Sequence, residues 1–221
     1  MLAAYDAIAD WYDRFVRDGV FVSAEQVIAA SGLEDGRTLA GTKICDLACG
    51  QGNLARALET RGAVVTGVDI SQRLLDLAIE QEQKASQGIA YIHGDAQNLP
   101  TLPGEPFDCV FCNLALMDMQ DIEAVLAGVR RILRPGGEFV VSVTHPCFQY
   151  PKGQNYSTEG FWRSDNPHGV RGQVGAYHRT LGTYITAFGN AGLLVDRAAE
   201  VGLPAYEFPP VLVLRCRYCG V

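Results

Sequence analysis

Short apolar runs alternate with segments of helical periodicity along most of the chain. The runs have strand length, are bounded by turn residues, and lie at 43–48, 63–68, 89–92, 107–112 and 138–143. The clearest helical stripe lies between the second and third runs, at 72–84, where Leu74 and Ala78 share one face behind Ser71 as the N-cap. Strands that alternate with amphipathic helices predict an α/β domain with a mostly parallel sheet.

The beginning of the chain has a helical pattern of its own. Aromatic and aliphatic side chains recur at helical spacing, with acids on the other face, at Tyr5, Ile8, Tyr12 and Phe15. One interpretation is an ordinary amphipathic helix that packs on the sheet. Ser23 is a predicted N-cap, with Gln26 at the capping-box position, for a second helix that ends near Ser31.

The second half of the chain continues the alternation. Asp121 can cap a helix at 122–133, and the Arg-Pro-Gly-Gly segment at 134–137 is a strong stop signal. A further helix at 180–191 precedes two apolar runs, at 193–201 and 211–218, which we expect to be the closing strands.

Residues 144–175 break this pattern. The segment has no regular period and is rich in glycine, polar and aromatic residues. Structureless segments of this length inside a compact domain are usually functional lids or disordered, and disordered segments are poor in aromatics. We therefore expect a lid over a pocket for a ligand.

The bulk composition limits the function classes. A chain of 221 residues suits one α/β domain, and a net charge of −7 disfavours nucleic acid or an anionic membrane as a partner. No leader-like segment begins the chain, and no apolar run approaches the roughly 18–20 residues of a membrane span, so we expect a cytoplasmic protein.

Seven cysteines, an odd number in apolar runs, are typical of reduced intracellular thiols. Two C-x-x-C spacings occur, at Cys109/Cys112 and Cys216/Cys219. Both lie in strand-like runs, where residues three apart face opposite sides of a sheet, so their sulfurs do not converge. We predict packing thiols and no metal site.

The stretch at 42–58 carries the main functional signal. An apolar run turns through Gly50 and Gly52 and becomes a helical pattern. Glycines let the backbone approach a ligand closely, and the free N–H groups at a helix N-terminus point toward it. This unit predicts a ligand site.

Two acids indicate the ligand. Asp69 closes the next strand, about 20 residues beyond the glycines, where an acid grips a ribose in Rossmann-type units. Gly50-x-Gly52-x-x-Ala55 would also pass a loose dinucleotide fingerprint. Asp46, however, precedes the turn, where it would repel a pyrophosphate but can pair, directly or through water, with an ammonium group. A ligand with a ribose and an amino-acid tail is S-adenosylmethionine.

The motifs D-L-A-C-G-Q-G-N, G-V-D-I-S, G-D-A-Q-N-L-P, F-D-C-V-F-C-N-L-A-L and L-R-P-G-G-E-F-V-V-S resemble those of class I S-adenosylmethionine-dependent methyltransferases, in the family's order. The resemblance covers roughly residues 5–144. The departure is Ala48, where many members carry glycine. The resemblance implies a Rossmann-like, doubly wound, mostly parallel seven-stranded sheet with helices on both faces, an antiparallel last strand and a small lid.

The resemblance also implies cofactor contacts. Tyr5 and Tyr12 would close over the methionine end, Ile70 would lie against the adenine unless it is plain core, and the Asp95-Ala96 step would supply an acceptor and a donor to the adenine. Asn113 and Leu114, at the carboxyl end of a strand, are expected to face the methyl donor or the acceptor. The complete predicted set is Tyr5, Tyr12, Asp46, Ala48, Gly50, Gly52, Asn53, Asp69, Ile70, Leu74, Asp95, Ala96, Asn113 and Leu114.

The predicted organisation is one methyltransferase domain over 1–221. Cap helices occupy 1–35, the cofactor-binding core 36–144, the lid or acceptor segment 145–176, and the last helix with the closing strands 177–221.

Candidates for catalysis follow from position alone. If the acceptor is a hydroxyl or an ammonium, a group must take its proton, and histidine is the usual choice. His145 follows the fifth strand and His178 follows the lid; Tyr177 is a further candidate as an orienting hydroxyl. Each histidine has an alternative role as a structural residue that holds the lid.

The expected function is methyl transfer to O, N or C of a small, partly apolar or planar acceptor. The alternatives are a tRNA or protein methyltransferase on the same core, an NAD(P)-dependent oxidoreductase, and a non-catalytic S-adenosylmethionine-binding protein. An oxidoreductase would leave Asp46 and the G-D-A and N-L-A-L steps without a role, and the acidic balance disfavours tRNA. The sequence leaves the oligomeric state open.

Overall fold

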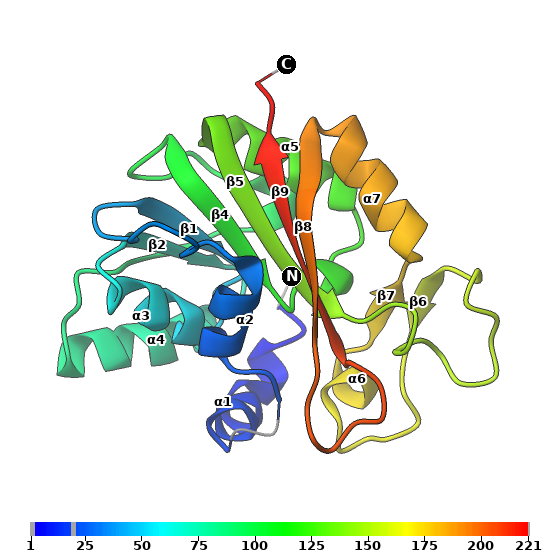
Figure 1. Cartoon of the computed structure of the whole chain (residues 1–221). Helices are drawn as coiled ribbons and strands as arrows, with labels where there is room; N and C mark the ends of the chain where they lie inside the picture. The colour runs from blue at the N-terminus through cyan, green and yellow to red at the C-terminus, as the bar shows by residue number, and fades with distance from the viewer. Residues whose placement is uncertain (1–2, 19–20, 221) are drawn as a thin grey trace.

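A computed structural model describes residues 3–18 and 21–220 (Figure 1). The parts of the predicted cap and of the C-terminal segment at residues 1, 2, 19, 20 and 221 lie outside these described residues. Within the described ranges, no helix combines the length and apolarity that a membrane crossing requires.

The centre of the fold is a seven-stranded sheet in the order β3-β2-β1-β4-β5-β9-β8. Neighbouring strands from β3 through β5 pair in parallel, whereas β9 is antiparallel to both β5 and β8. The strands are β1 Lys43–Leu47, β2 Val64–Asp69, β3 Ala90–His93, β4 Phe107–Asn113, β5 Leu133–Thr144, β8 Leu193–Val201 and β9 Val211–Tyr218. The predicted fold class, with its antiparallel last strand, is confirmed.

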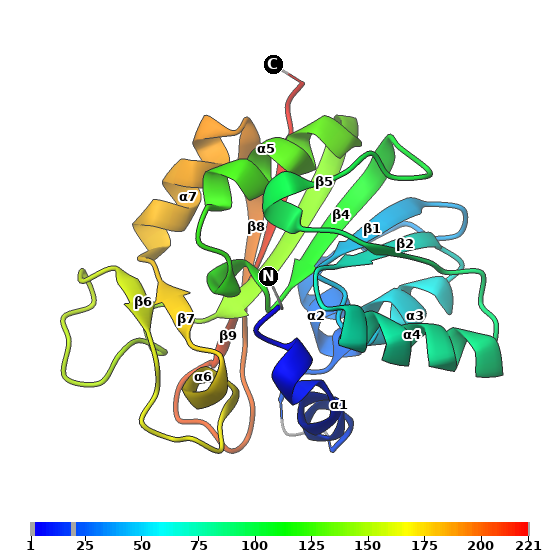
Figure 2. The ribbon, with the colours of Figure 1, turned by 180° about the vertical axis from the view of Figure 1, so that it is seen from behind.

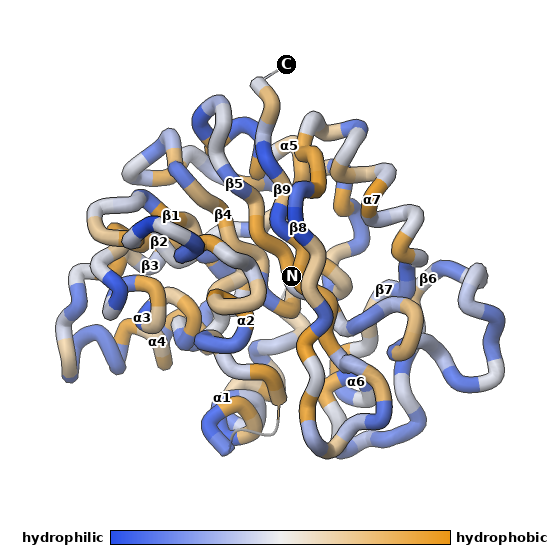
Figure 3. Tube along the Cα trace, in the orientation of Figure 1, coloured by the Kyte–Doolittle hydropathy of each residue, from blue (hydrophilic) through white to orange (hydrophobic). Residues whose placement is uncertain are grey.

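Helices cover both faces of the sheet (Figures 1 and 2). On one face α2 (Ala24–Ser31) and α3 (Asn53–Glu59) bury apolar side chains against the strands; on the other, α5 (Ile122–Ile132) and α7 (Leu181–Asn190) do so. Each face thus has its own apolar core, and Cys109 and Cys112 lie in different ones. The strands that carry these cores are coloured as apolar in Figure 3, and polar colours dominate the outer loops.

Helix starts follow the predicted caps. Ser23 and Gln26 form a complete capping box at α2. Ser71 caps α4 (Gln72–Lys84), and Asp121 accepts a backbone N–H at the start of α5. Thr180, the predicted first residue of the helix at 180–191, is instead the N-cap of α7. Before α2, the chain forms η1 (Asp6–Ile8) and α1 (Ala9–Arg17).

Two local features differ from the sequence-based expectation. The expected stop at 134–137 lies inside β5, which begins at Leu133, and the pairing register with β4 shifts there: Leu133 pairs with Phe107, and Glu138 pairs with Cys109. The segment 145–176 is also not structureless. It contains α6 (Val170–Gln173) and β6 (Gly160–Trp162), and β6 pairs with β7 (Ala176–His178). Such short elements show no measurable periodicity in a sequence.

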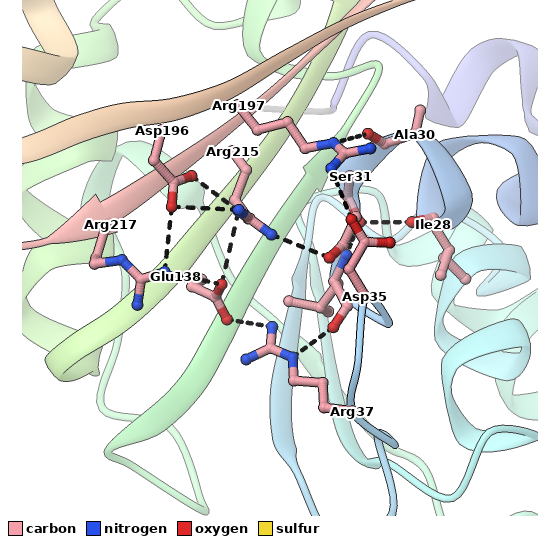
Figure 4. A network of polar contacts seen from close by, with 12 residues as sticks. Ile28, Ala30, Ser31, Asp35, Arg37, Glu138, Asp196, Arg197, Arg215 and Arg217 are labelled. Carbon is pink, nitrogen blue, oxygen red and sulfur yellow. Dashed lines mark hydrogen bonds and ion pairs between the residues drawn. The ribbon is translucent and has the colours of Figure 1, made fainter.

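Ion pairs join α2 and its connector to the sheet at the amino-terminal end of β5 (Figure 4). Glu138 is buried and lies within ion-pair distance of Arg37, Arg215 and Arg217. Arg215 also donates to Asp196 at 2.8 Å. Because the ligand edge of an open parallel sheet is the carboxyl end, this network lies away from it.

Candidate active site

A cavity of about 390 Å³ opens at the carboxyl ends of β1, β2 and β4. The strand order reverses at β1, which is flanked by β2 and β4, and ligands of open α/β sheets bind at such a switch point. The N-terminal segment and the 145–176 segment supply the outer walls, and α1 and α6 lie beyond this edge of the sheet in Figure 1.

Most of the predicted cofactor residues line this cavity: Tyr5, Tyr12, Ala48, Gly50, Asp69, Ile70, Leu74, Asp95, Ala96, Asn113 and Leu114. Asp46, Gly52 and Asn53 are not among the lining residues.

The backbone of the two strand-end loops is strained at the cavity wall. Ala48 and Leu114 are non-glycine residues in the left-handed region, with φ of 60° and 53°. This conformation costs an L-residue roughly 1–2 kcal/mol and persists only where its surroundings hold it. At Leu114, the backbone N–H donates to the carbonyl and to the hydroxyl of Ser142, at 3.0 and 2.9 Å. The same Ser142 hydroxyl donates to Asn113 at 2.6 Å.

Asp69 is held by backbone donors on both sides. The Gly50 N–H donates to Oδ2 and the Ser71 N–H donates to Oδ1, each at 2.7 Å. Burial raises the pKa of this carboxyl, and the two backbone donors oppose the rise. Each carboxylate oxygen keeps a further lone pair that can accept from a diol.

Asp46 is a buried carboxyl, 1% exposed, beside the glycine turn. Among the described residues, neither of its oxygens has a hydrogen-bond partner. Burial, helped by the charge of Asp69, raises its pKa to about 7. A nearby cationic ligand would relieve this cost, so the orphaned carboxyl fits a group that carries an ammonium.

The third strand ends in a step suited to a planar base. The Asp95 side chain accepts from the Gln97 N–H at 2.9 Å, which fixes its orientation at the cavity wall beside Ala96. Ile70 is 45% exposed and lines the same cavity, so it is not plain core. An apolar side chain and a fixed acceptor together can hold an adenine.

Gly52 serves packing rather than close ligand approach. Its φ is 80°, and a Cβ added there would lie 2.2 Å from the Tyr91 hydroxyl. Asn53 begins α3, and its side-chain oxygen accepts from Arg56 at 2.5 Å. Neither residue lines the cavity, and their cofactor contacts stay predictions.

The N-terminal segment reaches the cavity through its tyrosines. Tyr5 and Tyr12 pack edge to face with ring centroids 5.1 Å apart. The Tyr5 hydroxyl donates to Asp118 at 2.7 Å, and Arg171 forms an ion pair with the same carboxylate. The cap interpretation of this helical pattern thus has its geometric basis, since an ordinary surface helix would not line the cavity.

The lid contributes an aromatic edge. Phe161 and Tyr177 line the cavity and meet edge to face at 5.2 Å. Phe161 is 54% exposed, and the Arg179 guanidinium lies 5.3 Å from the Tyr177 ring centroid. Most other aromatics of the segment pack elsewhere. Tyr150 and Tyr156, for example, surround His178.

Neither predicted catalytic histidine lines the cavity. The His145 ring is buried; its Nε2 lies 2.9 Å from Glu200, and its Nδ1 accepts from the Cys147 N–H at 3.3 Å. His178 Nε2 donates to the carbonyl of Tyr156 at 2.7 Å. The position of His145 at the carboxyl edge is as expected, but its side chain turns toward the end of β8. Both contacts match the structural alternative for these histidines, whereas Tyr177 does reach the cavity.

Several wall residues escaped the sequence interpretation, namely Gln97, Asp118, Met119, Gln120, Val174 and Gly175. Asp118 follows the N-L-A-L motif closely, so a search for polar residues just beyond that strand end would have found it. Val174 and Gly175 of the lid follow no strand-end motif that would have marked them in the sequence.

Comparison with known proteins agrees with this geometry. The profile of a family described as "Methyltransferase domain" matches residues 45–141. A structure described as an S-adenosylmethionine dependent methyltransferase from Mesorhizobium loti is 26% identical, with a TM-score of 0.69, and covers 88% of this chain and 98% of that one. These similarities support a class I S-adenosylmethionine-dependent methyltransferase. S-adenosylmethionine is the cofactor of those enzymes.

Other similar proteins carry specific names. The ubiquinone biosynthesis O-methyltransferase of Pseudomonas syringae pv. tomato is 29% identical over 144 residues, which are 64% of this chain and 61% of that protein. The chain thus spans about three fifths of the length of the curated relatives it matches first. The 1,6-didemethyltoxoflavin-N1-methyltransferase of Burkholderia thailandensis is 17% identical, with a TM-score of 0.71 over 97% of this chain and 86% of that one, a likeness of fold alone.

Proposed function

We propose that this protein transfers the methyl group of S-adenosylmethionine to O, N or C of a small acceptor that is planar or partly apolar. One observation carries the proposal. A single cavity joins Asp69, Asp95 and the glycine turn, which suit the cofactor, to the lid aromatics Phe161 and Tyr177. Donor and acceptor would share one enclosed space.

The residues of the cavity would mainly align the cofactor with the acceptor and enclose both. Bound S-adenosylmethionine supplies a methyl group that its sulfonium already activates. Asp69 would hold the ribose hydroxyls, and Asp46 would balance the ammonium directly or through water. The cap tyrosines and Phe161 would exclude water, which favours in-line displacement by holding the reacting groups in line.

If the acceptor must lose a proton, we expect a side chain that lines the cavity to take part. Tyr177 is the predicted catalytic residue that lines the cavity, and we propose it as the hydroxyl that orients the acceptor. The imidazoles of His145 and His178 are engaged by Glu200 and by the Tyr156 carbonyl, which favours a supporting role for both.

The acceptor class has support from two sides. The lid presents aromatic edges, and edge-to-face packing with an aromatic partner is worth about 0.5–1.5 kcal/mol. The curated relatives are named as O-methyltransferases of ubiquinone biosynthesis. We propose an acceptor of comparable small size.

The test is a product assay. Purified protein is incubated with S-adenosylmethionine and a panel of phenols, nitrogen heterocycles and activated C–H compounds, and S-adenosylhomocysteine is measured. We expect turnover with at least one class and its loss in Asp69→Ala. S-adenosylhomocysteine formed only with tRNA or with a protein substrate would contradict the proposal.

A further inference from the structure

The carboxylate of Asp118 contacts both segments that form the outer walls of the cavity. Asp118 ends η3 (Leu116–Asp118), just past β4, and lines the cavity itself. Its Oδ2 accepts from the Tyr5 hydroxyl at 2.7 Å, and its Oδ1 is paired with Arg171 of α6. One side chain of the core therefore holds the N-terminal segment and the lid at the same time.

Both contacts lie in a poorly solvated place. The side chains of Arg171 and Asp118 are 18% and 19% exposed. Burial raises the pKa of Asp118, while Arg171 and the Tyr5 hydroxyl act to lower it. Charge-assisted hydrogen bonds in such surroundings are stronger than exposed ones. Arg171 also donates to the carbonyl of Gly175 at 3.0 Å, which fixes the wall beside Phe161.

The N-terminal segment is also tied to the opposite side of the cavity. Asp6 accepts from the Ser71 hydroxyl at 2.6 Å and from the Arg73 N–H at 3.2 Å. Ser71 in turn donates its N–H to Asp69. Adjacent residues of the cap thus reach toward the end of β2 and the end of β4, so the segment spans the cavity.

We propose that Asp118 is a positioning residue that couples the N-terminal segment and the lid, so that the two open and close over the cofactor as one unit. The inference rests on the proposed function, because enclosure matters only where a cofactor and an acceptor must be kept from water. Release of product would then require both Asp118 contacts to break together.

The chain carries a reporter in each moving part. Its two tryptophans are Trp11, in α1, and Trp162, in β6 of the lid. Trp11 stacks on Phe15 at 5.2 Å, and Trp162 packs against the apolar core. Trp162→Phe leaves only the cap reporter and Trp11→Phe leaves only the lid reporter, and acrylamide quenching measures how exposed each one is.

The decisive result is a cross-effect in the ligand-free protein. We expect Tyr5→Phe, which removes one hydroxyl from the cap, to increase the quenching of Trp162 in the lid. Arg171→Met in the lid should increase the quenching of Trp11 in the cap, and Asp118→Asn should increase both. Tyr150→Phe is the matched control, because its hydroxyl makes no hydrogen bond within the described residues, and it should change neither signal.

Binding provides the second readout. Loss of a charge-assisted hydrogen bond should weaken S-adenosylhomocysteine binding about tenfold or more in Tyr5→Phe and Arg171→Met, but not in the control. If each substitution exposes only the tryptophan of its own segment, the coupling is contradicted even when S-adenosylhomocysteine binds. If the wild type does not bind it at all, the proposed function fails, and the quenching cross-effect still decides the coupling separately.

Discussion

At the scale of single residues, the site is built around carboxyls held in unfavourable surroundings. Asp69 has backbone donors on both oxygens, whereas Asp46 is more deeply buried and has no partner among the described residues. A carboxyl in that position destabilises the ligand-free protein when it is charged. The same lack of a partner lets the Asp46 carboxylate bind a cationic group, so the cost to the stability of the ligand-free protein favours ligand binding.

The pH dependence of stability should reveal Asp46. Its folded pKa of about 7 lies above the unfolded value of 3.8, so the native state binds the proton more tightly. Its contribution is therefore harmless below about pH 4, and the destabilisation grows between about pH 4 and pH 7 and levels off above that at about 4 kcal/mol. Asp46→Asn should flatten this fall in urea unfolding of the ligand-free protein while weakening cofactor binding. Identical pH slopes for both proteins would contradict the assignment.

The ribose acid can be tested by one substitution. Asp69→Ala should weaken S-adenosylhomocysteine binding by at least about 1–3 kcal/mol, because it removes charged acceptors for the ribose and for the glycine turn. Calorimetric titration measures the loss. Glu80→Ala, an exposed carboxyl on α4, is the matched control and should bind normally. Unchanged affinity in Asp69→Ala would remove the ribose assignment.

At the scale of elements, the lid is fastened to the sheet by contacts between distant segments. The His145 N–H donates to the carbonyl of Pro210, and its ring contacts Glu200 at the end of β8. The ring also lies 4.6 Å from that of Phe148, which stacks on Phe208. These contacts fix the direction in which the chain leaves β5.

The role of His145 follows from these contacts. His145→Ala should lower the free energy of unfolding by about 1–3 kcal/mol, because it breaks buried hydrogen bonds, and should leave cofactor affinity nearly unchanged. Turnover should fall less than the 10²-fold or more expected for the loss of a general base. Glu200→Gln should show the same pattern more weakly. A fall in turnover of about 10²-fold or more with an unchanged free energy of unfolding would instead support His145 as the general base.

At the scale of the whole molecule, the stabilising network and the ligand cavity lie at opposite ends of the sheet. Glu138 is 5% exposed and faces three arginines, of which Arg37 and Arg217 are partly exposed. Stability and binding should therefore be separable by mutation.

Glu138→Ala should lower the free energy of unfolding by about 1–3 kcal/mol, because Arg37 would lose its carboxylate partner, whereas Arg215 and Arg217 would keep Asp196. Binding of S-adenosylhomocysteine should stay as in the wild type, provided that the measurement is made well below the unfolding temperature. Glu207→Ala, an exposed acid in the β8–β9 loop, is the control for stability. A weaker affinity for S-adenosylhomocysteine in Glu138→Ala would mean that the ion-pair network and the ligand cavity are coupled.

The sequence predicts this molecule well where the signal is local. The bounds of β8 and β9, the capping box of Ser23 and Gln26 and the order of strands and helices depend on side chains close together in the chain. The Tyr5–Asp118–Arg171 contacts join segments far apart in sequence. The direction of the His145 ring depends on how β8 packs. Neither leaves a periodic pattern in the sequence, so the sequence predicts that a lid exists but not its short elements or its contacts with the sheet.

The most direct test of the account is calorimetric titration of the purified protein with S-adenosylhomocysteine, with NAD as the control ligand. The account predicts binding of S-adenosylhomocysteine in the micromolar range, lost in Asp69→Ala, and no heat of binding with NAD. Binding of NAD alone would contradict the interpretation of Asp46 and of the cavity, and would favour an oxidoreductase instead.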